Sequence, residues 1–340
     1  MSSGGGLGYS QTLGGRGKTS QFGDLAENSQ SLKLIQHGGA FASFQATSFK
    51  RRDFCCVRRN DRLLSSLSLL PQGWATLKLS EKEGIAMTRT DWLDLLVVDL
   101  PSQSRFYQDL FGFEVLEQSA TRVELGSHGK KRLGLQAGAQ RVVDPRQSGL
   151  YHAAWLLPTR ADLGAWLLET QRKGVRLSGA SDHGVSEAIY LSDPEGNGIE
   201  VYWDKPRSEW PHVSGKLAMV TEALNIRSLA QASKGHRWEG FPVGAELGHL
   251  HFQSHELDRA AEFYEDLGFE LSQVYPGARF YSLDGYHHDV AVNQWQARYP
   301  RDFSAAGLLS YGLQLESRGE NRILDVLGTT CVLESLLCQK

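Results

Sequence analysis

Apolar and polar residues follow a regular period only from about Asp91 onward. Residues 1 to about 86 are rich in glycine, serine and arginine and keep neither a period of two nor one of 3.6. This composition is typical of disorder. A long organelle-targeting peptide is one alternative, and an artificial extension upstream of a start at Met87 is another.

The first periodic stretch predicts a strand, a helix and three more strands. A strand-like run over residues 92–100 leads into a helix over 101–111, which Gly112 ends. Three short strands follow, separated by turn residues, at 113–116, 122–125 and 132–136. The stretch is therefore one β-α-β-β-β unit.

A second unit starts with a strand over residues 149–157. Thr159 is a candidate N-cap of the next helix, which Gly174 ends. A loop over 181–187 and a strand over 188–191 lead to the turn that begins at Asp193. In the final strand Glu200 and Tyr202 lie on one face, opposite the apolar residues. A carboxylate among apolar neighbours must be solvated, paired or bound to a metal, so Glu200 needs a partner.

The remaining chain predicts a linker and two further units. Residues 205–246 are polar and aperiodic, as expected of a linker. A third unit starts at Leu247 with a strand and continues with a helix over 257–267. A fourth starts at Gly307 and loses the pattern after residue 315, so residues 316–340 are expected to be an irregular tail.

An internal repeat connects these units. The segment FYQDLFGFE from Phe106 matches FYEDLGFE from Phe263, with one residue fewer in the second copy. The predicted fold class is α+β, with repeated βαβββ modules that form curved mixed sheets and a truncated last module. Residues 87–204 hold two modules, and residues 247–315 hold one full module and the start of another. Each copy must bury its sheet face against another copy, so function is expected between copies.

Composition narrows the class of protein. The 340 residues carry a net charge of −3 and are 41% hydrophobic, so neither a nucleic-acid nor a membrane partner is expected. No apolar run reaches the roughly 18 residues that span a bilayer, and no secretory signal is recognisable. The four cysteines show no metal-ligand spacing, and so few in a long chain make a disulfide framework improbable. A cytoplasmic protein is the expectation.

Three residues in the first or last strands of their units could hold a metal. His152 and His249 lie in the first strands of the second and third units, and Glu200 lies in the last strand of the second. Two imidazoles and one carboxylate leave coordination positions open, an arrangement suited to a non-haem Fe(II) that binds substrate and O₂. The alternatives are that each histidine is a structural strand residue and that Glu200 pairs with a nearby lysine or arginine.

Several motifs carry a family resemblance over about residues 91–315. They are the two FYxDLxGFE-like segments, GLYHAAWLLP, SDHGVSEAIYLSDPEGNGIEVYWDKPRSEW, LGHLHF and DGYHHDVAVNQW. These motifs resemble the vicinal oxygen chelate superfamily, also called the glyoxalase/bleomycin resistance/extradiol dioxygenase superfamily. Their order is most similar to that of bacterial catechol 2,3-dioxygenase-like proteins with two such domains.

The resemblance implies a metal held in the cup of a curved sheet formed by paired modules. Carried over by position, the ligands are His152, His249 and Glu200. The equivalent place in the first unit holds Trp92, which cannot ligate a metal, and the fourth unit has no histidine there. A complete ligand set therefore requires the second and third units to face one another.

Other polar and aromatic residues are assigned around this set. His183 and His287 are the candidate proton-transferring residues, each with a solvated or surface position as the alternative. His251 is expected to line the pocket or to lie just outside the ligand set, rather than to bind the metal. His287 and His288 are placed in a strand starting at Tyr286, where alternation would aim only one of them inward. Three aromatic residues are expected in the core rather than in a substrate wall: Tyr202, Trp155 and Trp295.

The resemblance implies a metal-dependent extradiol dioxygenase that cleaves a catechol-like aromatic diol with O₂. Fe(II) is the expected metal, ahead of Mn, Zn or Ni, and a homo-oligomer is compatible with the sequence. One alternative is a glyoxalase-type isomerase or thiol transferase. Another is a non-catalytic protein that binds small molecules, which the missing histidine of the first unit and the short fourth unit favour.

Overall fold

The computed structural model describes residues 90–315, 321–325 and 327–335, and the predictions for residues 1–86 lie outside these ranges. The first unit comprises β1 (Thr90–Val97), α1 (Leu100–Phe111), β2 (Glu114–Gln118), β3 (Arg122–Ser127) and β4 (Lys130–Ala137). The second comprises β5 (Gly149–Leu156), α2 (Arg160–Arg172), β6 (Gly179–Asp182), β7 (Ser186–Ser192) and β8 (Gly198–Asp204). The third comprises β12 (Glu246–Gln253), α4 (Leu257–Asp266), β13 (Glu270–Tyr275), β14 (Ala278–Ser282) and β15 (Val290–Asn293). The fourth comprises β16 (Gly307–Leu315), β17 (Asn321–Leu324) and β18 (Thr330–Ser335).

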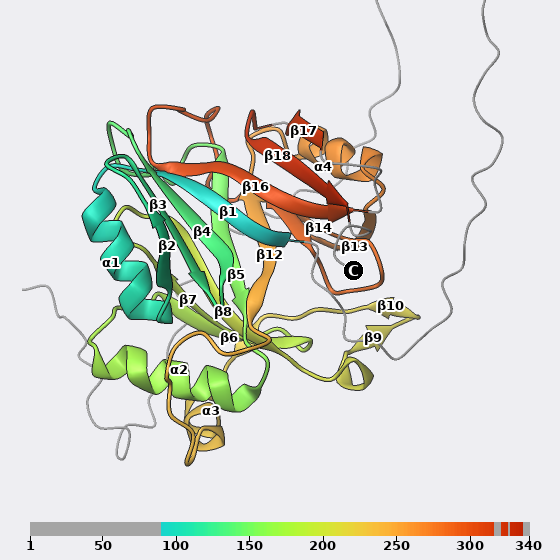
Figure 1. Cartoon of the computed structure of the whole chain (residues 1–340). Helices are drawn as coiled ribbons and strands as arrows, with labels where there is room; N and C mark the ends of the chain where they lie inside the picture. Colours follow the sequence, from blue (N-terminus) through green and yellow to red (C-terminus); the bar gives the residue numbers. More distant parts are fainter. Residues whose placement is uncertain (1–89, 316–320, 326, 336–340) are drawn as a thin grey trace, which may run out of the picture.

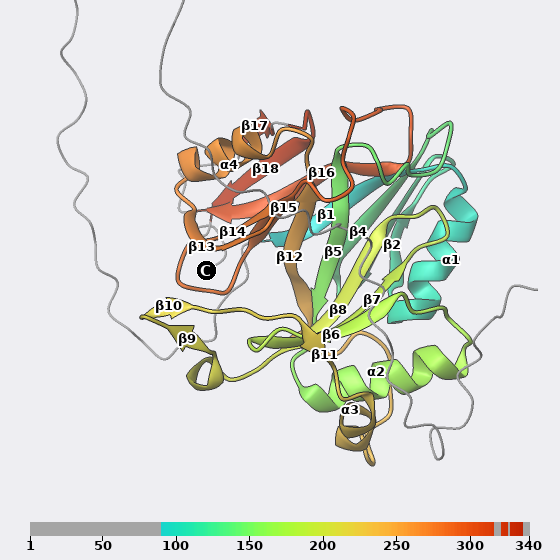
Figure 2. The same ribbon diagram turned by 180° about the vertical axis from the view of Figure 1, so that it is seen from behind.

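The units pair into two large mixed sheets (Figures 1 and 2). A seven-stranded sheet has the order β17-β18-β16-β1-β4-β3-β2, in which β1 pairs antiparallel with β16. A nine-stranded sheet has the order β11-β6-β7-β8-β5-β12-β15-β14-β13, in which β5 pairs antiparallel with β12. The first unit therefore joins the fourth, and the second joins the third. The predicted α+β class with curved mixed sheets is confirmed.

The end of the chain differs from the irregular tail expected after residue 315. Residues 321–324 and 330–335 form strands, and β18 lies between β16 and β17 in the seven-stranded sheet. Cys331, Val332 and Leu333 are consecutive and all buried. A strand buried on both faces shows no alternation, so its pattern could not be recognised in the sequence.

The segment expected to be a linker also contains regular structure. It holds a 3₁₀ turn (Arg207–Glu209), a hairpin of β9 (His212–Val213) and β10 (Lys216–Leu217), β11 (Glu222–Ala223) and α3 (Ile226–Ala232). Strand β11 extends the nine-stranded sheet beside β6. The side chain of Asn225 caps α3 by accepting from Ser228 N, and Leu229 is fully buried. Elements of two to seven residues are too short to give a periodic signal.

One hydrophobic core lies between the two sheets. Trp155, from β5, contacts Phe111 of α1 and Phe113 at ring-centroid distances of 5.3 and 5.4 Å. Leu250 and Phe252 of β12 point into the same core and are at most 1% exposed. Because side chains alternate along a strand, the other face of the nine-stranded sheet is left for polar residues. Among the described residues, no helix is both long and apolar enough to cross a membrane.

The turn before β8 fastens the second unit to the first. Asp193 is 5% exposed and accepts four hydrogen bonds, from Glu195 N, Asn197 N, Asn197 Nδ2 and Tyr107 Oη. The carboxylate of Glu195 accepts from Val98 N and Asp99 N, just before α1. The tyrosine of the repeated FYxDL segment thus holds the turn from which β8 and Glu200 emerge.

Two positions in this turn require glycine for different reasons. Gly196 has a φ of 94°, a left-handed conformation that side chains disfavour. A Cβ on Gly198 would lie 2.0 Å from the carbonyl oxygen of Tyr151, so only glycine lets β8 approach β5 this closely.

Candidate metal centre

Three side chains singled out by the sequence lie together on neighbouring strands. His152 is on β5, Glu200 on β8 and His249 on β12, and β5 is the middle strand. One ligand atom from each lies within 4.8 Å of the others. The Nε2 atoms of His152 and His249 are 2.9 and 3.6 Å from Glu200 Oε2. The pairing of β5 with β12 brings the second and third units together, as the ligand set requires.

A small residue at the centre of these strands leaves room for the group. Ala154 is in register with Glu200 on β8 and with His249 on β12, and its side chain is fully buried. It lies two residues from His152, on the same face of β5. A larger residue at this position would project into the space shared by the three ligand side chains.

The hydrogen bonds of the group are incomplete in a way that fits a metal. His152 Nε2 and both ring nitrogens of His249 are buried and have no hydrogen-bond partner among the described residues. Their short distances to Glu200 Oε2 therefore do not have hydrogen-bond geometry. Buried polar atoms are almost always paired, so orphaned nitrogens that converge on one carboxylate need a further partner. Two imidazoles and one carboxylate are a donor set suited to a divalent transition metal.

The charges of these side chains also suit ligation. Burial raises the pKa of Glu200, but the neighbouring charge of His152 and contacts with both histidines outweigh it and hold the pKa well below its usual range. Burial lowers the pKa of His249 to about 4, against the opposing effect of Glu200. At neutral pH Glu200 is therefore ionised and His249 is neutral, the forms in which both bind metals.

His251 lies beside the group without joining it. Its ring is 4.8 Å from the ring of His152 and 5.1 Å from that of Tyr151, measured between centroids. Asn293 Nδ2 donates to His251 Nε2 over 3.1 Å. Burial holds the pKa of His251 well below its usual range, so the ring is neutral. Its role beside the ligand group stays a prediction.

His183 lies in the loop between β6 and β7, where the sequence placed it, and reaches toward the group through a tyrosine. Its Nδ1 is 2.8 Å from the carbonyl oxygen of Val220 and must donate to it. Its Nε2 is 2.7 Å from Tyr190 Oη, which must then donate in the neutral imidazole. Tyr190 is in register with Glu200, and the ring centroids of Tyr190 and His152 are 5.7 Å apart.

His287 and His288 are not in a strand, contrary to the prediction. Strand β15 begins at Val290, so both histidines lie in the bend before it and alternation does not apply. Both are buried. His287 Nε2 is 2.9 Å from Asp204 Oδ1, and its Nδ1 is 2.8 Å from His288 Nδ1. Both nitrogens of His287 are therefore engaged. The ring centroid of His288 is 4.0 Å from that of His249, and the centroid of His287 is 5.9 Å from it.

The three aromatic residues have separate positions. Trp155 is in the core, as expected. Tyr202 is fully buried on the polar face of the sheet, where its hydroxyl is 2.9 Å from that of Tyr286. The prediction of a core position is wrong for Trp295, which is 41% exposed and contacts the rings of Tyr151 and His251.

Two residues of the surroundings were missed. Tyr190 contacts both His183 and His152, and Asp204 accepts from His287 and from Tyr286 Oη. Alternation offered a signal for the second, because Asp204 follows Glu200 and Tyr202 on the same face of β8. Tyr190 could have been found from the expected pairing of its strand, β7, with β8, which puts it in register with Glu200.

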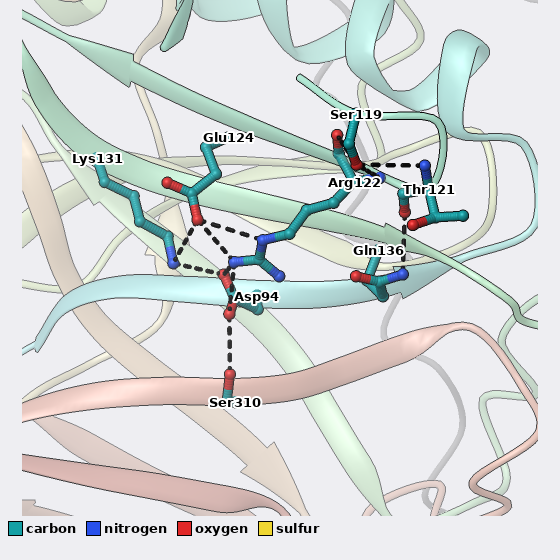
Figure 3. Close-up of polar contacts among 8 residues, drawn as sticks. All are labelled: Asp94, Ser119, Thr121, Arg122, Glu124, Lys131, Gln136 and Ser310. Carbon is teal, nitrogen blue, oxygen red and sulfur yellow. Dashed lines mark hydrogen bonds and ion pairs between the residues drawn. The ribbon is translucent and has the colours of Figure 1, made fainter. Parts of the chain in front are cut away.

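The seven-stranded sheet uses the corresponding positions differently (Figure 3). Trp92, at the place of His249, donates from Nε1 to Glu334 Oε1 over 2.7 Å. Asp94, at the place of His251, forms ion pairs with Lys131 at 2.8 Å and Arg122 at 3.2 Å, and accepts from Ser310. These charges satisfy one another. Among the described residues, His152, Glu200 and His249 are the one group with metal-ligand geometry.

The family follows from comparison with known proteins. Residues 89–201 match the model of the Glyoxalase/Bleomycin resistance protein/Dioxygenase superfamily. A curated relative is 38% identical over 242 residues, which cover 68% of this chain and 85% of that protein. The chain therefore belongs to this superfamily.

That relative is the catechol-2,3-dioxygenase of Bacillus subtilis (strain 168). A second, the biphenyl-2,3-diol 1,2-dioxygenase 3 of Rhodococcus globerulus, is 27% identical over 145 residues, 40% of this chain and 76% of that protein. Among solved structures, a candidate dioxygenase from Bacillus subtilis subsp. subtilis str. 168 superposes with a TM-score of 0.50 at 11% identity, over 73% of this chain and 86% of that one. This last similarity supports the fold alone.

Proposed function

We propose that the chain is a metal-dependent extradiol dioxygenase that cleaves the ring of a catechol-like aromatic diol. The observation that carries the proposal is the buried group of His152, Glu200 and His249, in which His152 Nε2 and both ring nitrogens of His249 have no hydrogen-bond partner among the described residues. The name of the Bacillus subtilis relative supports the reaction class. A ferrous ion held by these residues would supply the redox chemistry that ring cleavage by O₂ needs.

The protein's own residues have distinct parts in this proposal. Glu200 and the two ligand histidines fix the position of the metal from three adjacent strands, which is a rigid support. His183 holds a proton acceptor, Nε2, against the hydroxyl of Tyr190 and can take up a proton that leaves the diol by way of this hydroxyl. His287 has both nitrogens engaged and acts by orienting His288.

The other two candidate functions are less well supported. A glyoxalase-type isomerase or thiol transferase generally places more carboxylate around its metal, and the group here has one. The binding-protein alternative was favoured by the missing histidine of the first unit and the short fourth unit. Both units lie in the other sheet, so neither has to supply a ligand.

Anaerobic reconstitution tests the proposal. The purified chain is loaded with Fe(II), and separately with Mn(II), Zn(II) or Ni(II), and each form is mixed with a panel of catechols in air-saturated buffer. We expect the Fe(II) form to consume one O₂ per catechol and to produce a yellow ring-cleavage product. Metal binding without O₂ uptake on any catechol would count against a dioxygenase, and no binding of any metal would favour the binding protein.

Replacement of His183 by alanine is expected to lower turnover with little effect on the metal. Because its Nε2 contacts Tyr190 rather than a ligand atom, the loss should be roughly 10²- to 10⁴-fold in kcat, the range of general acid-base catalysis. The measurements are kcat and metal content of the same preparation, with the exposed His212 replaced by alanine as control. Unchanged kcat would remove His183 from the mechanism.

A further inference from the structure

A pocket of about 270 Å³ lies apart from the candidate metal centre, at the beginning of α4. Ser148 and His255 line it, four residues before His152 on β5 and four after His251 on β12. At a rise of roughly 3.3 Å per residue, this spacing puts the pocket on the order of 13 Å along the strands from the histidines of the sheet. The two sites are therefore separate.

The internal repeat shows what occupies this place in the first copy. Val98 and Asp99 precede α1 as His255 and Glu256 precede α4, at the same offset that relates Phe106 to Phe263. In the first copy, a buried carboxylate, that of Glu195, accepts hydrogen bonds from Val98 N and Asp99 N.

The second copy has lost that carboxylate. Asp325 accepts from the backbone amides two and four residues later, as Asp193 does, so the turn is the same and Leu327 stands at the place of Glu195. The amides of His255 and Glu256 donate instead to the hydroxyls of Ser148 and Ser254. Leu327 itself lines the pocket.

Positive charge surrounds the place from which the carboxylate is missing. Arg259 and Arg301 line the pocket beside the ring of His255, and Glu256 lies at the same wall. Burial lowers the pKa of Arg301, and the buried carboxylate of Asp325 opposes this effect. Glu256 is 3.5 Å from Arg259 and 3.9 Å from His255, and its side chain is half exposed. Arg301 donates to Thr329 Oγ1 over 2.5 Å and to the carbonyl oxygen of Leu308. No carboxylate of the described residues lies within ion-pairing distance of Arg301.

The remaining wall is apolar. Pro300, Phe303 and Leu327 line the pocket, and the Arg301 guanidinium lies 4.8 Å from the centroid of the Phe303 ring. Phe303 is 59% exposed. An occupant that suits these walls carries one anionic group for the guanidinium groups and an apolar body for the ring.

We propose that this pocket binds a small organic carboxylate, which supplies beside Leu327 the negative charge that Glu195 supplies in the first copy. The carboxylate pairs with Arg259 and Arg301, and the apolar body packs on Phe303 and Leu327. The proposal does not depend on the reaction at the candidate metal centre.

Calorimetric titration of the full chain with benzoate tests the proposal, with benzyl alcohol and inorganic phosphate as comparison probes. We expect saturable binding of benzoate, and much weaker binding of the other two. Replacement of the exposed Arg259 by alanine should weaken benzoate binding about tenfold, the effect of losing one charge-assisted hydrogen bond. The His249→Ala chain should bind benzoate with the same affinity as the parent. Benzoate that bound at the metal centre instead would bind this variant more weakly.

Leu327→Glu is the decisive variant, because it restores the carboxylate of the first copy and should abolish benzoate binding. Circular dichroism checks that this variant is folded. Three results would overturn the proposal: no saturable benzoate binding, benzoate binding by folded Leu327→Glu equal to that of the parent, or phosphate binding as tight as benzoate. The last would show a pocket that responds to charge alone.

Discussion

Replacement of His249 by alanine is expected to remove metal binding and ring cleavage together. His249 contributes two buried nitrogens without another partner, and its pKa of about 4 keeps the ring neutral and able to ligate. Loss of a residue that only hydrogen-bonds to a metal ligand lowers metal affinity roughly 10- to 100-fold, and loss of a ligand itself should lower it more. The measurements are metal content after reconstitution and the shift in Tm on addition of a chelator, which should vanish in the variant.

The exposed His212 provides a matched control for this experiment. It lies on β9, its Nδ1 is 2.8 Å from the carbonyl oxygen of Trp210, and it is not part of the ligand group. His212→Ala should keep both the metal and the chelator-dependent shift in Tm. A His249→Ala chain that holds iron as tightly as the parent would exclude His249 as a ligand.

The ligand group could be located from the sequence because strand periodicity fixes which side chains share a face. Glu200 lies opposite the apolar residues of its strand, and His152 and His249 recur at related places in two units. The sequence could not show that β5 pairs with β12, because pairing between units depends on the fit of whole sheet faces. A complete ligand set required the second and third units to face one another, and β5 and β12 of these units are paired in the structure.

Residues on irregular backbone were harder to place. His287 and His288 precede β15 in a bend, so the alternation used for them had no physical basis. Trp295 was expected in the core because of its size, yet it lies after β15 with its ring against Tyr151 and an exposed edge. Burial of a residue outside a strand or helix depends on tertiary contacts that periodicity does not contain.

The turn that carries Asp193 was first of interest because it leads to Glu200, and the structure gives it a second part. Asp193 and Glu195 accept hydrogen bonds from the first unit, so the position of β8 depends on contacts between sheets. Asp325 accepts the corresponding backbone bonds in the fourth unit, but its tyrosine partner is Tyr311 of the same unit, whose hydroxyl is 3.2 Å from that of Tyr264, the counterpart of Tyr107. The repeat therefore keeps a buried carboxylate in the fourth unit, which contains none of the candidate metal ligands.

Replacement of Asp193 by alanine is expected to destabilise the chain by on the order of 3 to 5 kcal/mol, since it leaves several buried donors without an acceptor. These donors are the amides of Glu195 and Asn197 and the hydroxyl of Tyr107. Denaturant unfolding of the metal-free chain measures the loss. The hydroxyl alone is removed by Tyr107→Phe, which should cost about 1 kcal/mol.

Asp193→Ala should also weaken metal binding, because the turn positions β8 and Glu200 lies on this strand, only three residues beyond Asn197. Asp144 offers the control: it is a partly exposed aspartate that accepts from its near neighbour Arg146, so Asp144→Ala should change neither quantity appreciably. If Asp193→Ala unfolds at the same denaturant concentration as Asp144→Ala, the turn does not fasten the units together. If it is destabilised but binds metal as tightly as the parent, β8 is held in place by its pairing with β5 and β7 alone.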